Sequence, residues 1–229
     1  VDLLTRQLSQ DLNPVLLPGA DRDAKPMDEH VAKQNLARYG LLVPRGIKVL
    51  DRAKAAQAAM AVGFPVALKT LGLAHKTGSN GLALSLNSSE EVNTALLNLA
   101  PGSVLIEHMI AGTVTELLVG VTRDPAHGFV LTIAAGGTMT ELLEARASLL
   151  VPVAREHVTT ALNSLNMAPL MHGYRGKPSI NFEALLDAID ALQSYVLANA
   201  DSLEEVEINP LICTAQAAIA ADALIRKTQ

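Results

Sequence analysis

Several residue types are scarce in this chain, and each shortage excludes a class of protein. Aromatic residues make up 3% of the 229 residues and tryptophan is absent, so we expect no surface that stacks nucleic-acid bases. Eighteen Lys and Arg face 23 Asp and Glu, and the net charge of −5 gives no electrostatic footprint for DNA or RNA. The single cysteine, Cys213, excludes an internal disulfide and a cysteine-based zinc cage and suits a reducing cytoplasm.

Long apolar runs are also missing. No stretch approaches the roughly 18 uninterrupted apolar residues that a membrane span needs, and the start "VDLLTRQLSQ" lacks the basic-then-apolar pattern of a signal peptide. We therefore expect a cytoplasmic protein with neither a membrane nor a nucleic acid as partner. Since the chain does not begin with methionine, a domain of a longer protein is one interpretation of it.

What the chain has is an apolar share of 49%, which predicts an ordered core of Ala, Leu, Val and Ile. Residues 1–27, with several prolines, are expected to form a linker or arm. The next 75 or so residues read as alternating helices and strands. The predicted helices are "DEHVAKQNLARYG", capped by Asp28, "DRAKAAQAAMAVG", capped by Asp51, and "SSEEVNTALLNLAPG", opened by a capping box of Ser88 and Glu91. The predicted strands are "GIKVL", "FPVALKT" and "GLALSL".

The second half predicts a different arrangement. The strands "SVLIEHMI", "GTVTELLVGVT" and "FVLTIAA" follow one another through short turns and are expected to form an antiparallel sheet. Helices are predicted over 155–166 and 181–199, and "EEVEINPLICT" with "QAAIAADALI" reads as a final hairpin. The fold class is therefore α+β, with one subdomain over 28–102 and a second over 103–229.

That hairpin carries the first candidate site. A turn at Thr214 and Ala215 would place Glu207 opposite Asp222, with Asn209 on the face of Glu207 because side chains alternate along a strand. Like charges across a strand pair are destabilising unless a cation lies between them, and Asp, Glu and Asn oxygens are ligands that Mg²⁺ takes together with phosphate oxygens. The alternative is a solvated strand edge on which both acids point to water.

The second candidate site is the stretch "ALKTLGLAHKTGSNG". Lys69 ends an apolar strand, where a lysine is rare unless its charge is matched. It either extends its ammonium group to the surface or binds phosphate. His75 and Lys76 follow in a loop of small residues that would let backbone N–H groups approach an anion.

Two acids lie on strands expected to be buried. Glu107 follows "VLI" and Glu116 lies within "VTELLVG", so both need donors. Ribose hydroxyls or an adenine amino group would serve, and so would salt bridges to Lys69 or Lys76.

Read in order, these pieces resemble the ATP-grasp domain of the ADP- or NDP-forming acyl-CoA synthetases, the family of ADP-forming acetyl-CoA synthetase and the succinyl-CoA synthetase β subunit. The resemblance covers roughly residues 28–225. It rests on "DEHVAKQNLARYGLLVPRG", "ALKTLGLAHKTG", "VLIEHMIAGTVTELLVGVTRDPAHG", "AAGGTMTELLE", "HGYRGKP", "VEINPLI" and "AIAADA". It implies an ATP-grasp fold of two α+β subdomains with ATP or ADP and Mg²⁺ bound between them.

The family also implies a role for each candidate residue. Lys69 corresponds to the phosphate-binding lysine, the segment from Lys76 to Gly78 to the phosphate-covering loop, and Glu116 to an acid of the nucleotide pocket. The implied nucleotide-binding residues are Lys69, Lys76, Thr77, Gly78, Glu107, His108, Met109, Ile110 and Glu116, those from Glu107 to Ile110 forming the hinge that receives adenine. The implied Mg²⁺ ligands are Asn209 and Asp222, with Glu207 beside them.

His75 matches the histidine that is implied to accept a phosphoryl group, the catalytic residue of this chain. In the family, an acyl phosphate forms on a CoA-binding, CoA-ligase domain or α subunit, fused or separate, which binds CoA and the carboxylate. A histidine of that partner takes the phosphoryl group, and the ATP-grasp domain passes it to ADP. The chain departs from the family pattern at Gly78 and Glu144, where aspartates are expected.

The predicted function is therefore the nucleotide-binding part of an ADP-forming acid–CoA ligase that is active only with its partner. An alternative is a nucleotide-binding regulatory module of a fused protein acetyltransferase. A carboxylate–amine ligase, which the "HK" and "HGYRGKP" motifs argue against, and a non-enzymatic interaction domain are further alternatives.

Overall fold

The computed structural model describes residues 23–72, 80–137 and 146–228. The chain divides into two compact units, a small unit of Pro44–Ala111 and a large unit formed by Val1–Val43 together with Gly112–Gln229. The chain therefore passes between the units twice, and the small unit is an insertion within the large one.

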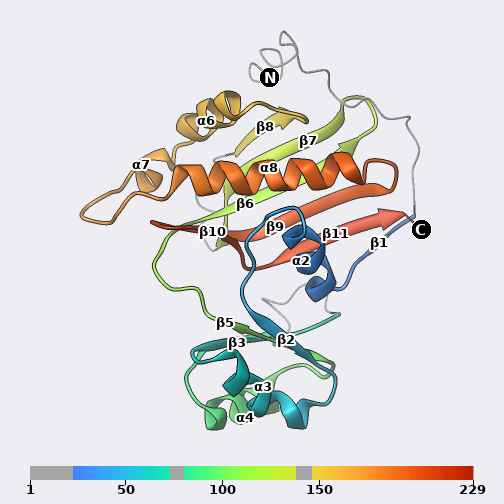
Figure 1. Ribbon diagram of the computed structural model, residues 1–229, viewed down its shortest axis with the longest axis vertical. Coiled ribbons are helices and arrows are strands. Elements are labelled where there is room, and N and C mark those ends of the chain that lie inside the picture. Colours follow the sequence, from blue (N-terminus) through green and yellow to red (C-terminus); the bar gives the residue numbers. More distant parts are fainter. Residues whose placement is uncertain (1–22, 73–79, 138–145, 229) are drawn as a thin grey trace. The chain divides into compact units, whose positions relative to one another are not determined.

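The small unit is a four-stranded antiparallel sheet with helices on one face (Figure 1). Its strands, in spatial order, are β2 (Gly46–Val49), β5 (Val104–His108), β3 (Val66–Thr70) and β4 (Leu82–Leu86). The helices are η1 (Arg52–Lys54), α3 (Ala55–Val62) and α4 (Ser89–Asn98). The helix starts are as predicted, because Asp51 accepts a hydrogen bond from the Ala53 N–H and Ser88 accepts one from the Glu91 N–H.

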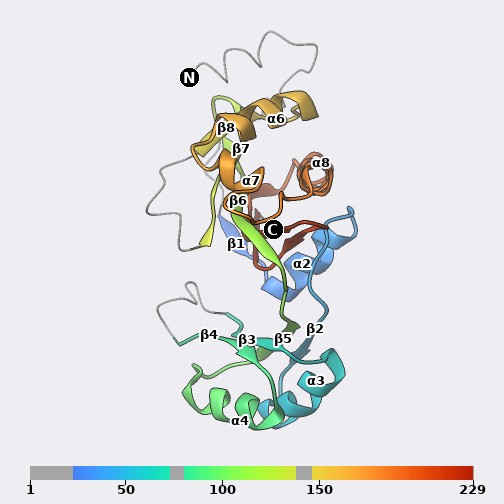
Figure 2. The ribbon, with the colours of Figure 1, turned by 90° about the vertical axis from the view of Figure 1, so that its left-hand side faces the viewer.

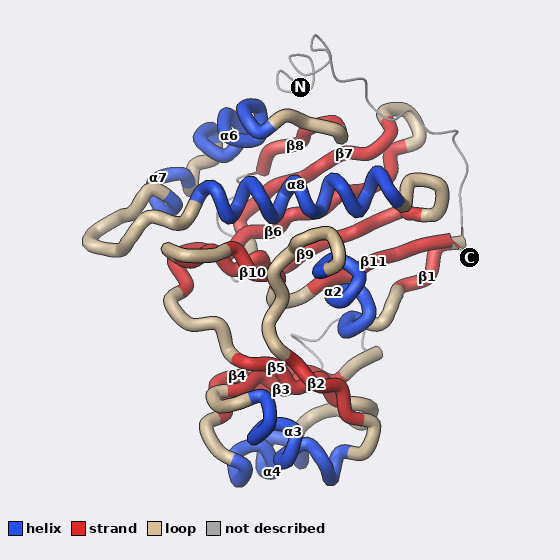
Figure 3. Tube along the Cα trace, viewed as in Figure 1, coloured by secondary structure: helices blue, strands red, loops and turns tan. Residues whose placement is uncertain are grey.

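The large unit is built on a seven-stranded sheet in which all paired neighbours are antiparallel. Its path runs β1 (Ala24–Pro26), β11 (Ala223–Thr228), β9 (Leu203–Thr214), β6 (Thr113–Asp124), β7 (Gly128–Ala135) and β8 (Arg146–Leu150), while β10 (Ala218–Ala220) also pairs with β9. The helices are α2 (Glu29–Ala37), α6 (Arg155–Ser164), α7 (Ala168–Met171) and α8 (Phe182–Ala198). Figures 2 and 3 show α2 and α8 covering one face of this sheet.

The core of the large unit lies between the sheet and α8. The helix predicted over 181–199 is confirmed as α8, and its apolar residues at helical spacing, Leu185, Leu186, Ile189, Leu192 and Val196, are all buried. The apolar face of α2 is narrower: Ala32 and Leu36 are buried, whereas Val31 and Tyr39 are 41% and 38% exposed.

The division into units differs from the boundaries expected from the sequence. Helix α2 belongs to the large unit because it packs on β11 and α8. The strand predicted over "SVLIEHMI" is β5, which pairs with β2 and β3 of the small unit instead of extending the sheet of β6 and β7. Part of the expected N-terminal arm is also structured, since Ala24 to Pro26 form β1, paired with β11. Long-range pairing, which local patterns do not encode, decides all three points.

No helix in the described residues is both long enough and apolar enough to cross a membrane.

Candidate functional site

Acidic and amide side chains gather where β9 passes the gap between β10 and β11. Glu207 and Asn209 lie on β9, and Asp222 lies in the gap. The predicted register was wrong by two residues: the Thr214 N–H donates to the Ala217 carbonyl at 2.8 Å, so the turn is Ala215 and Gln216, and Glu207 faces Leu224. A shift of two leaves every side chain on its predicted face, and the Asn209 N–H donates to the Asp222 carbonyl at 3.3 Å.

The electrostatics of this cluster favour a cation. Burial is the largest cause that raises the pKa of Glu207 above its usual value. The negative charges of Glu205 and Asp222 raise that pKa further, while a hydrogen bond with the Asn209 side chain lowers it. A divalent cation would relieve this repulsion, and two carboxylates with one amide oxygen are the hard donors that Mg²⁺ prefers.

The cluster does not enclose a metal by itself. Among residues 23–72, 80–137 and 146–228, no group of three or more His, Cys, Asp or Glu side chains could hold an ion. A cation bound by Glu207, Asn209 and Asp222 would therefore take further oxygen ligands from elsewhere. Phosphate oxygens are such ligands, as is usual for Mg²⁺.

In the small unit, Lys69 and Glu107 form a buried ion pair. Lys69 Nζ lies 3.0 Å from Glu107 Oε2, and the two side chains are 8% and 4% exposed. Lys69 lies on β3 and Glu107 on the neighbouring β5, one diagonal step apart, since Ala67 is the direct partner of Glu107. The structure thus rules out extension of Lys69 to solvent and confirms the salt bridge. Gly46 on β2 makes room for Glu107, because a Cβ there would lie 2.8 Å from its Cγ.

The residues from His108 to Ile110 follow Glu107 and lead out of the small unit, which ends at Ala111. The His108 N–H donates to the Arg45 carbonyl and the Met109 N–H donates to the Pro65 carbonyl, each at 2.9 Å. No hydrogen bond of the Ile110 N–H is found within the described residues.

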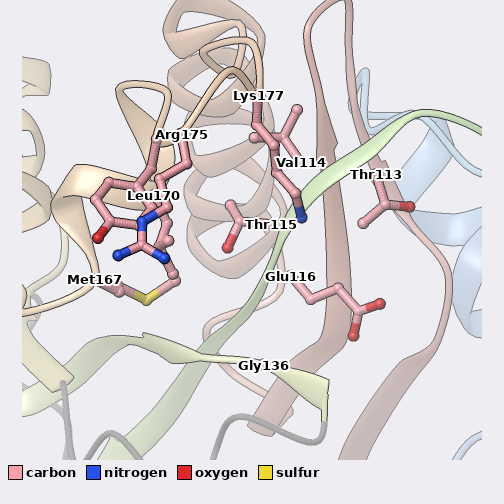
Figure 4. A pocket seen from close by; sticks show the side chains of 10 residues that line it. Thr113, Val114, Thr115, Glu116, Gly136, Met167, Leu170, Arg175 and Lys177 are labelled. Carbon is pink, nitrogen blue, oxygen red and sulfur yellow. The ribbon is translucent and has the colours of Figure 1, made fainter.

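Glu116 lines a cavity of about 510 Å³ in the large unit (Figure 4). The cavity lies along the first residues of β6, beyond the point where β7 stops pairing with it. Its walls combine apolar and cationic groups from three segments, namely Thr113, Val114, Thr115, Glu116, Gly136, Met167, Leu170, Tyr174, Arg175 and Lys177. A Cβ on Gly137 would lie 2.0 Å from a Glu116 carboxylate oxygen, so any other residue there would force this carboxylate to move.

Four charged residues of the structure were not predicted from the sequence as functional or buried groups. Arg175 and Lys177 entered it only as letters of "HGYRGKP"; in the structure the Arg175 guanidinium lies 5.2 Å from the centre of the Tyr174 ring. The buried pair of Glu29 and Lys33 on α2 was missed as well. Glu29 and Lys33 are four residues apart and lie on the same helical face as the apolar Leu36, and this spacing could have predicted a buried ion pair. The predicted residues His75, Lys76, Thr77 and Gly78 lie outside the described residues.

Comparison with known proteins supplies the family. The model of the ATP-grasp domain matches residues 20–226. The chain belongs to the ATP-grasp family. As an ATP-grasp domain it has the expected fold, with mixed helices and two antiparallel sheets.

Among curated relatives, a prokaryotic trans-feruloyl-CoA synthase is 31% identical in an alignment 225 positions long, which covers 92% of this ATP-grasp chain and 32% of that protein. The β subunit of ADP-forming acetate–CoA ligase I of Pyrococcus furiosus is 26% identical over 91% of this chain and 94% of its own length. The chain thus spans about a third of the first relative and nearly all of the second.

Among solved structures, the acetyl-coenzyme A synthetase 1 of Ca. Korarchaeum cryptofilum is similar. Its complex with coenzyme A and Ca-AMPCP has a TM-score of 0.80 and 26% identity, covering 88% of this chain and 93% of that one. Its complex with coenzyme A and Mg-AMPPCP, in which a phosphohistidine segment points towards the nucleotide binding site, has a TM-score of 0.73 and 25% identity, covering 86% and 90%.

Proposed function

We propose that this chain is the nucleotide-binding part of an ADP-forming acyl-CoA synthetase and transfers a phosphoryl group between a histidine of its partner and ADP. The observation that carries the proposal is the cluster of Glu207, Asn209 and Asp222, where the pKa of Glu207 is raised by burial and by neighbouring negative charges. It is a cation site short of ligands, which a nucleotide phosphate would complete. The relatives named as ADP-forming acetate–CoA ligases support the same proposal.

In this proposal each candidate residue contributes to the binding of the metal or of the nucleotide. Glu207, Asn209 and Asp222 hold Mg²⁺, which neutralises the phosphates when bound. Lys69 contributes a positive charge that it shares between Glu107 and a phosphate. The Ile110 N–H donates to the adenine ring, and Glu116 accepts from the nucleotide, with ribose hydroxyls as donors.

The chemical step moves one phosphoryl group. The P–N bond of the partner's phosphohistidine breaks, its electron pair returning to that imidazole, as a new P–N bond forms to a deprotonated ring nitrogen of His75. The P–N bond to His75 then breaks, its electron pair returning to the His75 ring, as a P–O bond forms to a terminal oxygen of ADP. His75 is proposed as the residue of this chain that accepts the phosphoryl group between donor and ADP. Coenzyme A and the carboxylate are bound by the partner, a CoA-ligase domain or α subunit, so this chain alone does not make the thioester. The relatives named as ligases do not favour the regulatory module as an alternative.

A direct test measures the binding of ADP to the purified chain by calorimetry, with Mg²⁺ and with EDTA. We expect binding that Mg²⁺ strengthens and that Asp222→Asn weakens by about tenfold or more, while the variant stays folded. A second measurement incubates the chain with γ-labelled ATP and Mg²⁺ and searches for acid-labile phosphate that His75→Ala abolishes. A folded chain that binds neither ADP nor ATP with Mg²⁺ would contradict the proposed function. If the chain binds nucleotide but no labelled phosphate is found on it, only the role of His75 as phosphoryl acceptor is contradicted.

A further inference from the structure

A buried lysine outside the residues proposed to bind the nucleotide reaches the backbone beside one of them. Lys33 lies on α2, and its Nζ is 2.8 Å from Glu29 Oε1, with the two side chains 3% and 5% exposed. The same Nζ donates to the Ala221 carbonyl at 3.0 Å. Helix α2 therefore contacts Ala221, the residue that precedes Asp222, although Lys33 and Ala221 are 188 positions apart in the chain.

Ala221 and Asp222 occupy the gap between β10 and β11, where the ladder with β9 is interrupted. The Ala221 N–H donates to the Pro210 carbonyl at 3.0 Å, and the Asp222 carbonyl accepts from the Asn209 N–H. The Ala221 carbonyl accepts from Lys33. This carbonyl lies in the same planar peptide unit as the Asp222 nitrogen, so its orientation also sets that of the Asp222 backbone.

We propose that Lys33 is a positioning residue of the metal site: by fixing the peptide between Ala221 and Asp222 it presents the Asp222 carboxylate to the Mg²⁺–nucleotide. Glu29 lies 2.8 Å from the buried ammonium group and holds it in place through the ion pair. This inference rests on the proposed function. It adds helix α2, near the start of the chain, to the groups that build the site.

The chemistry of the pair supports a role beyond stability. Buried ion pairs are often replaced by apolar residues of similar size at no cost in stability, because desolvation of the charges offsets their attraction. Besides the ion pair, Lys33 Nζ donates to the Ala221 carbonyl, which lies in the peptide unit that leads into Asp222. Lys33 thus holds the backbone of a proposed metal ligand without contacting the metal itself. Removal of groups that orient metal ligands in this way changes metal affinity by about 10- to 100-fold.

The test measures metal and nucleotide binding separately in the full chain. Free Mn²⁺, used as a probe for Mg²⁺, is followed by electron paramagnetic resonance in the presence of ADP, and ADP binding is measured in EDTA. In Glu29→Met with Lys33→Met, which removes both charges and keeps the volume, we expect the Mn²⁺ concentration at half-saturation to rise about tenfold. The ADP affinity in EDTA should stay within about twofold of the original chain, as for independent sites.

One further variant separates the hydrogen bond from the ion pair, and another serves as a control. Glu29→Gln keeps the Lys33 donor and should lower stability while leaving the Mn²⁺ half-saturation within about twofold. Lys227→Met is the matched control, since Lys227 lies on β11 itself but donates to Asn199, away from Asp222; it should change neither binding measurement.

The outcomes decide between a positioning and a purely structural role. An unchanged Mn²⁺ half-saturation in the folded double variant would overturn the inference, and so would a loss of ADP affinity in EDTA by the same factor as with Mn²⁺. If the double variant does not fold, Glu29→Gln decides: it keeps the Lys33 donor, so a rise of about tenfold in its Mn²⁺ half-saturation would overturn the inference. Failure of the original chain to bind ADP with metal would instead contradict the proposed function on which the inference rests.

Discussion

The small and the large unit both place charged groups on a sheet. In the small unit an acid is paired with a base, whereas in the large unit an acid lies near other acids. In the small unit, the Glu107 carboxylate lies 3.0 Å from the Lys69 ammonium group. In the large unit, burial raises the pKa of Glu207, and the negative charges of Glu205 and Asp222 raise that pKa further. The first site is neutral because its two charges balance, whereas the second is repulsive because its acids carry like charges. The same kind of side chain therefore stabilises one unit and strains the other.

The largest expected effect comes from breaking the neutral site. Lys69→Met removes the ammonium group beside the buried Glu107 carboxylate, so we expect the free energy of unfolding of the small unit to fall by about 3 to 5 kcal/mol. Urea denaturation of the full chain measures it. The double variant Lys69→Met with Glu107→Leu is the control and should recover most of the loss, because no charge is then left without its partner. A loss below about 1 kcal/mol in the single variant would place the pair with ordinary surface ion pairs.

An intermediate effect is expected from the backbone of the large unit next to Glu116. A Cβ on Gly136 would lie 2.6 Å from the Leu117 carbonyl carbon and within 3 Å of two more of its backbone atoms. Because backbone cannot move aside as a side chain can, Gly136→Ala should cost about 1 to 3 kcal/mol in thermal unfolding.

Gly120→Ala provides the control for Gly136→Ala, since its Cβ would lie 3.4 Å from the Val206 carbonyl oxygen, an ordinary contact. Equal losses in the two variants would show that the site near Glu116 is not rigid.

The smallest effect has the opposite sign and tests the repulsive site. Glu207→Gln removes a negative charge from among acids, so we expect the free energy of unfolding without metal to rise by about 0.2 to 1 kcal/mol. The same variant should bind Mg²⁺–ADP more weakly than the original chain. Chemical denaturation and calorimetry measure the two effects.

Glu204→Gln is the matched variant for Glu207→Gln, because it lies on the same strand but its carboxylate is 3.6 Å from the Arg123 guanidinium. It should lower the stability. A loss of stability in both variants would remove the contrast between the two units.

The sequence predicted the parts of the fold that depend on local pattern. The helical spacing of apolar residues sufficed for α8, and the capping residues sufficed for the starts of η1 and α4. The hairpin register was missed because the turn was placed one residue early. The Thr214 hydroxyl accepts hydrogen bonds from the Gln216 and Ala217 N–H groups, which is typical of a residue that opens a turn. That signal was present in the sequence.

Other features could not be predicted locally. Lys69 is paired because β5 lies beside β3, and α2 joins the large unit because β11 lies beneath it. Both facts depend on the order of strands in a sheet. The face on which Glu207 and Asn209 lie was nevertheless correct, since an error of two residues in register does not change it.

The pairing of β1 with β11 has a consequence for how the chain folds during synthesis. Ala24 faces Thr228 across this pair, so the sheet of the large unit cannot be completed until β11 has left the ribosome. The small unit is continuous, from Pro44 to Ala111, and has all its strands long before that. Because domains tend to fold as units as they emerge, the inserted unit should be the first to form. Helix α2 can pack only after β11, the strand that it contacts, has been synthesised.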